Sequence, residues 1–450
     1  MNKQLVNNIL CIIGVIAVIL VGIYLFATQH VLPEGMTQIR WSVDNNPMRK
    51  VVISSFEAKN PDIHVINDPN ADLQTVLTQL AGDVPPDIIT PYTIEAFRRL
   101  QRLGQLEDLT PYVEKYKIPV DKLRPELHDF VYIKDPEDGN KEKVYGIPEN
   151  AGPFCLFYNK DLFDQAGVPY PTNDMTWEDI REIAKKLTTY QDINGRQVVK
   201  TKGIYITEDP EFFIRMYGGR LFSEDGKKCL INTPEARKGL EFLETMKMKD
   251  HSVPSASEAQ SMAPTGGWGG ANLLLVQGRV AMLLCGRYLI IQYRDYYPKG
   301  VRLGIARCPK SPCDNNLIYS KCYCIPKNSK HKEEAARFLA MILSDENQAN
   351  INDYGDGWSA IDTPLMREVA KFNPKYPMED NNEELLKDFG GARTLEVSPW
   401  INTVDFMTVW QREVDKVWIG QQTMADACAH TERDVNKIIE RNIKNPNFLN

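Results

Sequence analysis

The stretch VYGIPENAGPFCLFYNKDLFDQAGVPYPTNDMTWEDIREIAKKL, residues 144–187, decides the fold. Its first part, 144–159, is an extended apolar run interrupted by glycine and proline, which is typical of strands separated by turns. The next part, 160–173, is a short element closed by glycine and proline. Thr176 then predicts a helix N-cap, Asp179 completes a capping-box pair, and apolar residues follow at spacings of three and four. We expect this stretch to carry the chain from one domain into a second, with a ligand site beside the crossing.

Length and composition indicate an ordinary globular protein of two domains. The chain has 450 residues, of which 43% are hydrophobic and 25% are charged. A chain of this length exceeds what one hydrophobic core usually holds. The formal net charge of -7 provides no field that would attract nucleic acid or anionic lipid, so neither is expected as a partner.

The N-terminus carries a hydrophobic segment. Residues 9–27 contain no charged side chain and follow Lys3, and about twenty apolar residues are enough to span a bilayer with the positive flank inside. An uncleaved signal anchor in the inner membrane is favoured over a cleaved signal peptide, which remains the alternative. In both cases residues after about 33 are expected to be periplasmic or otherwise extracytoplasmic.

Nine cysteines are many for an exported chain, and four of them cluster in the sequence. Cys308, Cys313, Cys322 and Cys324 follow the spacing C-x4-C-x8-C-x-C. One or two disulfides, reduced packing cysteines and a zinc site are the three alternatives. The spacing lacks two CxxC hooks and no pair of His lies nearby, so no metal ligand is assigned.

The chain after the hydrophobic segment alternates strands with helices. Strands are expected at 38–43, 63–66 and 87–90, with an amphipathic helix after each. This order predicts parallel βα units and an α/β sheet. Ligands of such sheets bind beyond the carboxyl ends of the strands, which here are Trp41–Asn45 and Thr90–Tyr92.

The second half is expected to build the second domain and then return. A strand is predicted at 201–206 and a buried strand at 280–284, while strands at 301–306 and 320–325 are expected to rejoin the first domain. The chain from about 382 onward is predicted to be mostly helical.

No catalytic constellation is evident. The sequence contains no G-x-S-x-G, HExxH or Walker motif, its six His are scattered, and no cofactor is expected. General acid/base work by Asp44, Glu149 or Asp356 stays open, because a sequence does not show separation in space.

Aromatic residues recur beside polar residues at predicted strand exits. Flat rings cover the apolar face of a sugar, and Asp, Asn or Arg can pair with its hydroxyls, so this pattern points to carbohydrate. Packing in a core remains the alternative for each ring. The pattern comprises Trp41 with Asp44, Tyr92, Trp268, Arg287 with Tyr288, and Asp356 with Trp358.

Four stretches of the chain resemble a known family, the extracellular solute-binding proteins of bacterial ABC transporters, specifically the maltose-binding-like sugar binders. Residues 277–290 (QGRVAMLLCGRYLI) and 320–348 (SKCYCIPKNSKHKEEAARFLAMILSDENQ) carry the more specific likeness, and residues 38–47 and 145–180 add to it. Taken together with their order along the chain, they extend the resemblance over nearly everything after residue 37. Tyr288, preceded by Arg287, stands where the family commonly has Trp, and the guanidinium could either favour an acidic sugar or form a structural ion pair.

The resemblance implies a type II periplasmic-binding-protein fold, in which two α/β lobes close over a central cleft. Lobe 1 would comprise 38–148 plus about 300–350, and lobe 2 would comprise 149–295 plus about 351–450, with 1–33 as signal anchor or signal peptide and linker. The chain would bind a sugar or oligosaccharide and deliver it to the permease subunits of an ABC transporter, without being an enzyme. The ligand-binding residues would be Trp41, Asp44, Asn45, Tyr92, Glu149, Asn150, Trp268, Arg287, Tyr288, Asp356 and Trp358.

Other functions compete with this one. A carbohydrate lyase or hydrolase anchored to the membrane could use a similar cleft with two carboxyl groups across one sugar bond. A tethered sensor is a weaker alternative, because nothing after the anchor looks like a signalling domain. The fold could also take a metal, an amine or a phosphonate. The crossing itself is expected at Pro148–Gly152, which makes Glu149 and Asn150 cleft residues near the hinge.

Overall fold

The computed structural model describes residues 32–82, 84–135, 141–206, 210–262, 270–313 and 316–445. The hydrophobic segment 9–27 and the loop that carries Trp268 lie outside these ranges. Within the described ranges, no helix is long and apolar enough to cross a membrane.

The strands follow one another along the described chain. They are β1 (Thr37–Ser42), β2 (Ile63–Asp68), β3 (Ile88–Ile89), β4 (Tyr132–Asp135), β5 (Lys141–Val144), β6 (Ile147–Pro148), β7 (Asn150–Asn159), β8 (Thr189–Ile193), β9 (Arg196–Tyr205), β10 (Val280–Gly286), β11 (Leu303–Arg307), β12 (Ile318–Tyr319), β13 (Cys322–Tyr323) and β14 (Trp358–Ser359).

The α-helices are α2 (Pro47–Lys59), α3 (Leu73–Ala81), α4 (Ile94–Arg102), α5 (Thr110–Tyr116), α6 (Lys160–Ala166), α7 (Trp177–Leu187), α8 (Pro210–Arg215), α9 (Pro234–Glu244), α10 (Ala256–Met262), α11 (Gly270–Val276), α12 (Ile290–Tyr293), α13 (Lys332–Ile342), α14 (Asp345–Tyr354), α15 (Pro364–Lys371), α16 (Asn382–Leu385), α17 (Thr403–Trp418) and α18 (Met424–Ile443).

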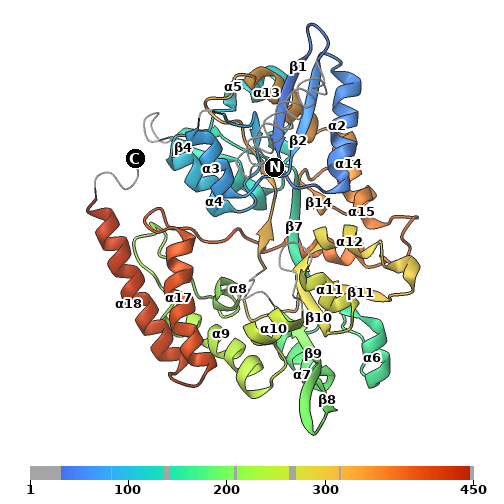
Figure 1. The fold of residues 1–450 in the computed structure, drawn as a ribbon, viewed down its shortest axis with the longest axis vertical. Helices are drawn as coiled ribbons and strands as arrows, with labels where there is room; N and C mark the ends of the chain where they lie inside the picture. The colour runs from blue at the N-terminus through green and yellow to red at the C-terminus, as the bar shows by residue number, and fades with distance from the viewer. Residues whose placement is uncertain are drawn as a thin grey trace, which may run out of the picture.

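A parallel three-stranded sheet forms the first lobe, in the order β2-β1-β3. Helices α2 and α13 pack beside it, and Figure 1 shows these elements together in the upper body. The predicted parallel βα units are therefore confirmed. The carboxyl ends of β1 and β3 lie side by side, since Ser42 pairs with Ile89.

A larger mixed sheet forms the second lobe, in the order β11-β7-β10-β9-β8. All ten residues of β7 are buried, which explains its continuous apolar run: a central strand has no solvent face. The prediction that residues 301–306 rejoin the first lobe is wrong. Strand β11 pairs antiparallel with β7, with Leu303 opposite Asn159, and so stays in the second sheet.

Local signals in the sequence set several helix boundaries. Thr176 and Asp179 form the predicted capping box of α7, and Thr233 caps α9 with Pro234 at its first position. Helix α9 also passes very close to α8. A Cβ added at Gly239 would lie 1.8 Å from the carbonyl oxygen of Phe213, so only glycine fits there.

Three segments run together where the chain passes between the lobes. Strand β6 pairs with β13, while β12 and β14 both pair with β7. In Figure 1 the long strand β7 links the upper body to the lower one, which holds β8–β10, α9, α17 and α18. Helix α14 packs against α2, and Arg124 donates to the carbonyl of Ala360, so the chain around 345–361 contacts the first lobe.

The clustered cysteines are neither bridged nor gathered around a metal in the described part of the chain. Cys308, Cys322 and Cys324 are buried, Cys313 is exposed, and all are free thiols. Among the described residues no three His, Cys, Asp or Glu side chains could hold a metal ion. The disulfide and zinc alternatives are therefore wrong, and the buried thiols act as small packing residues.

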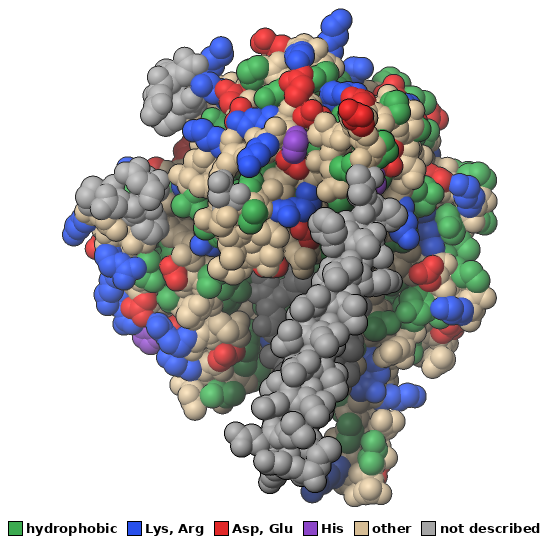
Figure 2. Space-filling view, turned by 45° about the horizontal axis from the view of Figure 1, so that its top comes forward, with side chains coloured by type: hydrophobic (Ala, Val, Ile, Leu, Met, Phe, Trp, Pro, Cys, Tyr) green, Lys and Arg blue, Asp and Glu red, His purple; other side chains and the backbone are tan. Residues whose placement is uncertain are grey.

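On the face drawn in Figure 2, Lys and Arg side chains alternate with Asp and Glu side chains without a patch of one sign. This mixture agrees with the net charge of -7, and neither favours a nucleic-acid surface.

Candidate functional site

A cavity of about 530 Å3 lies where the three crossing segments meet the first sheet. Its walls come from the loops that follow β1 and β3, from the start of β7, and from the chain around β10 and β12. The lining residues are Asp44, Pro69, Ala71, Asp72, Tyr92, Thr93, Asn150, Gly152, Tyr288, Tyr319, Ser320, Lys321 and Asp356. The prediction that the ligand crevice lies beyond the carboxyl ends of β1 and β3 agrees with this placement.

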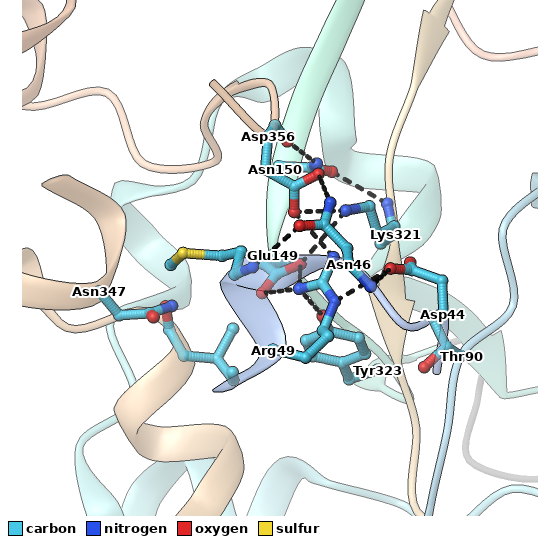
Figure 3. Close-up of polar contacts among 12 residues, drawn as sticks. Asp44, Asn46, Arg49, Thr90, Glu149, Asn150, Lys321, Tyr323, Asn347 and Asp356 are labelled. Atoms are coloured by element: carbon cyan, nitrogen blue, oxygen red, sulfur yellow. Dashed lines mark hydrogen bonds and ion pairs between the residues drawn. The ribbon is translucent and has the colours of Figure 1, made fainter. Parts of the chain in front are cut away.

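A buried ion cluster forms the floor of this region (Figure 3). The guanidinium of Arg49, on α2, is fully buried and donates from Nη1 to both carboxylate oxygens of Glu149 at 2.8 and 2.7 Å. Its Nη2 donates to Asp356 at 2.7 Å, and Tyr323 Oη accepts from Nη1 at 3.2 Å. Burial alone would lower the pKa of Arg49, but the neighbouring acids, Glu149 foremost, raise it well above its ordinary value.

Lys321 and Asp356 connect this cluster to the cavity. The ammonium of Lys321 donates to Asp356 at 2.5 Å and lies 3.8 Å from Glu149. Asn46 also donates to Asp356, at 2.9 Å. Asn150 donates to the backbone carbonyl of Asp356 and accepts from the backbone N–H of Lys321 at 3.1 Å. The three crossing segments are therefore held by one polar network around Glu149, Asn150 and Asp356.

Asp44 and Tyr92 form the polar edge of the first lobe. The hydroxyl of Tyr92 accepts from the backbone N–H of Asp44 at 2.7 Å and donates to its carboxylate at 3.1 Å. Burial alone would raise the pKa of Asp44, but the charges of Arg49 and Lys321 and these hydrogen bonds outweigh it and lower the pKa. Burial, followed by the charge of Asp44, raises the pKa of Tyr92. At neutral pH the pair is a carboxylate beside a neutral phenol.

Two further tyrosines face the cavity, Tyr288 from the second lobe and Tyr319 from a crossing segment. Tyr288 follows β10, and Gly286 makes room for its ring: a Cβ at Gly286 would lie 2.4 Å from Cε1 of Tyr288. Tyr319 stacks on Phe154 with ring centroids 5.3 Å apart and planes inclined by 16°. Together with Tyr92, they give the cavity three aromatic surfaces that keep a polar hydroxyl.

Two predicted stacking residues are core residues instead. Trp41 is fully buried, edge-on to Tyr323 at 5.2 Å and tilted against Phe338 at 4.9 Å. Trp358 is 1% exposed, and the guanidinium of Arg287 covers its ring at 4.2 Å. The prediction that these rings line the ligand cleft is therefore wrong, because the pattern of one aromatic at a strand end is equally typical of packing.

The remaining predicted residues divide into buried and exposed ones. Arg287 is 1% exposed, donates to the carbonyl of Gly357 at 3.0 Å and lies 3.4 Å from Glu379, so the structural ion pair is the correct alternative. Burial lowers the pKa of Arg287 to about 10. Glu149 is fully buried and does not line the cavity, whereas Asn45 is exposed on the surface. Trp268 lies outside the described residues.

Sequence reasoning named five of the residues that line the cavity and missed the others, among them Tyr319 and Lys321. Both belong to the segment 318–323, which runs from β7 in the second sheet to β6 beside the first. The prediction that residues 320–325 form a strand rejoining the first lobe agrees with the pairing of β13 with β6 and with the bridge from Cys324 to Ile89. The sequence does not indicate that the side chains at the start of this return face the cavity.

Comparison with known proteins now decides the family. A model of the family described as bacterial extracellular solute-binding protein matches residues 42–349. The chain belongs to this family. Members bind solutes and are not enzymes, so this chain is an extracellular solute-binding protein, and the alternative of a hydrolase or lyase finds no support.

Several individual proteins are similar to this chain. The arabinooligosaccharide-binding protein of Bacillus subtilis is 28% identical over 60% of this chain and 58% of its own length. The lactose-binding protein of Rhizobium radiobacter is 24% identical over 82% of this chain and 81% of its own length. An ABC substrate-binding protein from Listeria monocytogenes in complex with cycloalternan superimposes with a TM-score of 0.75 at 26% identity, over 90% of this chain and 99% of that one.

More distant structures share only the two-lobed fold. A maltose-bound protein from T. maritima has a TM-score of 0.68 at 19% identity, over 89% of this chain and 100% of its own. A Mycobacterium tuberculosis protein in complex with glycerophosphocholine has a TM-score of 0.70 at 15% identity, over 91% of this chain and 100% of its own. The fold alone therefore does not specify the ligand.

Proposed function

We propose that this solute-binding protein takes a sugar or oligosaccharide in the cavity between its lobes and delivers it to the permease of an ABC transporter. The observation that carries the proposal is the lining of the cavity, where Tyr92, Tyr288 and Tyr319 offer aromatic surfaces. Beside them, Asp44 and Asn150 supply hydrogen-bonding groups. Rings that cover C–H faces, with polar groups between them, suit a polyhydroxylated ligand. The names of the related sugar-binding proteins point the same way.

The extent of the hollow supports an oligosaccharide. A second cavity of about 190 Å3 shares the residues Ala71, Asp72, Tyr92 and Thr93 with the first. A third of about 160 Å3 shares Thr93 and Glu95 with the second. The three cavities adjoin one another through these shared residues, and the third lies mostly against residues 210–222 and 395–407 of the second lobe. Together they offer room for a ligand longer than one sugar ring.

The lobes and the membrane attachment complete the proposal. The first lobe would comprise about 38–148 and 316–371, and the second about 149–313 and 386–445, with the hinge at the three crossings. The uncharged segment 9–27 would hold the protein at the outer side of the inner membrane, near its permease.

The test is a thermal-shift screen of the full-length chain, purified in a mild detergent, against neutral, amino and acidic sugars of one to six units. A ligand that binds only the folded state raises the melting temperature by mass action. Tyr288→Ala and Tyr319→Ala should each weaken binding of the best ligand about tenfold, as expected for loss of one stacking contact. Tyr190→Ala, an exposed tyrosine on β8, is the control and should bind normally. Absence of any sugar-dependent shift would refute the proposed function.

A further inference from the structure

The charges of the ion cluster beside the cavity do not balance. Asp44, Glu149 and Asp356 contribute three negative charges, and Arg49 and Lys321 contribute two positive charges, which leaves one negative charge in excess. The ion pairs consume both cations, since Arg49 lies between Glu149 and Asp356 and Lys321 donates to Asp356.

The excess negative charge is accessible at Asp44. The side chains of Glu149 and Asp356 are fully buried, whereas that of Asp44 is 36% exposed and lines the cavity. Its contact with Arg49 is also the longest that this guanidinium makes, at 3.4 Å to Nε, and the two other nitrogens serve the other carboxylates. Asp44 is therefore the member of the cluster with room for another cation.

Beyond Asp44, the neighbouring cavity is also lined by negatively charged side chains. Asp72 lines both the main cavity and its neighbour, and Glu95 lines the neighbour, while Lys321 is the single Lys or Arg among the described residues that line either cavity. One carboxylate oxygen of Glu95, Oε1, is buried and has no hydrogen-bond partner in the described part of the chain. A buried acceptor without a donor costs free energy, so this oxygen favours a ligand that brings an N–H or O–H group.

A bound ligand displaces the water that solvates these carboxylates. The hydroxyl groups of a neutral sugar can donate hydrogen bonds but leave the net charge unchanged. The carboxylate of an acidic sugar would add repulsion. A protonated amine replaces the hydrogen-bond donors of the displaced water and also neutralises the excess negative charge of the cluster.

We infer that the preferred ligand is a sugar that carries a protonated amino group, which pairs with the carboxylate of Asp44. The inference rests on the proposed function and narrows it from sugars in general to amino sugars. It also gives the acidic lining a role in selectivity, because the same charges exclude sugar acids.

The test compares matched ligands on one backbone by isothermal titration calorimetry with the full-length chain. In both the gluco and galacto series, monomers and short oligomers are used as the neutral sugar, the 2-amino sugar, its N-acetyl derivative and the uronate. The amino sugar should bind about tenfold tighter than the neutral sugar, and the uronate should bind weakest. N-acetylation removes the charge while the nitrogen stays, so it should abolish the advantage.

Three variants assign the effect to its residue. Asp44→Asn should reduce the preference for the amino sugar to under about threefold. Asp72→Asn removes a second charge from the cavity, and Asn still caps the N-terminus of α3, so this variant should fold. It should reduce the preference for the amino sugar by a smaller factor. It therefore tests the inference even if Asp44→Asn proves unstable. Asp62→Asn, an exposed partner of Arg337 that lines none of these cavities, is the control and should bind as wild type does.

The outcomes separate this inference from the proposed function. If neutral and amino sugars bind within twofold of each other, or the uronate binds best, the amino-sugar inference is wrong while sugar binding stands. If no member of any series binds, both are refuted. An amino-sugar preference that survives in Asp44→Asn and Asp72→Asn would also overturn the assignment.

Discussion

Replacing Arg49 by Met should destabilise the protein by about 3–5 kcal/mol, the usual cost of removing one partner from a buried ion pair. The side chain is fully buried, as are those of its partners Glu149 and Asp356. Met is an unbranched side chain with a high helix propensity, so on α2 it replaces most of the buried stem of Arg49. The substitution therefore removes mainly the charge and the N–H donors of the guanidinium. Among the described residues, Glu149 would then keep Lys321, at 3.8 Å, as its one neighbouring cation.

The assay is urea unfolding monitored by circular dichroism and tryptophan fluorescence, with the free energy of unfolding compared between variant and wild type. The matched control is Arg337→Met, which removes an exposed pair with Asp62 at 2.7 Å and should cost under about 1 kcal/mol. Arg49→Lys keeps the charge but cannot bridge two carboxylates, and should fall between the two. A loss from Arg49→Met no larger than that of the control would refute the view that this cluster holds the crossings together.

Three further predictions concern stability. Trp358→Ala should lower the free energy of unfolding, measured by urea titration, by about 3–5 kcal/mol, because the ring is 1% exposed and supports the guanidinium of Arg287. A variant of normal stability with weakened sugar binding would contradict the assignment of Trp358 to the core. Burial raises the pKa of Asp388 to about 6 from an ordinary 3.8, so its protonation favours folding below about pH 4 and that contribution is lost as pH rises through 6. The free energy of unfolding of the wild type should therefore fall between pH 4 and 6, and Asp388→Asn should remove this fall. A variant with the same dependence of stability on pH as the wild type would contradict the raised pKa of Asp388. Gly239→Ala should destabilise the contact between α8 and α9, because its Cβ would meet the carbonyl of Phe213, and a melting temperature equal to wild type would show that the helices can separate.

The sequence predicts the fold well where local signals decide. The capping box at Thr176, the parallel strands around β1 and the crossing beside Glu149 all depend on neighbours in the chain or on patterns of fixed period. The position of β11 cannot be predicted in this way, because the sequence of an apolar strand does not indicate which sheet it joins.

The site is harder to predict, because side-chain exposure depends on tertiary contacts. Trp41 and Tyr92 both end predicted strands, yet Trp41 turns into the core against Phe338 while Tyr92 turns to the cavity. Arg287 finds its carboxylate in Glu379, far along the chain. Tyr319 reaches the cavity only because its segment is a crossing. Each outcome was set by a partner distant in sequence.

The most direct measurement is the affinity of the double variant Tyr288→Ala/Tyr319→Ala for the sugar that gives the largest thermal shift with wild type. Both rings line the cavity, and each stacking contact is worth about 0.5–1.5 kcal/mol beyond its buried area, so together they should weaken binding on the order of 100-fold. Isothermal titration calorimetry gives the affinity, and urea unfolding of the unliganded variant shows that it is folded. Affinity within threefold of wild type would contradict binding between these lobes.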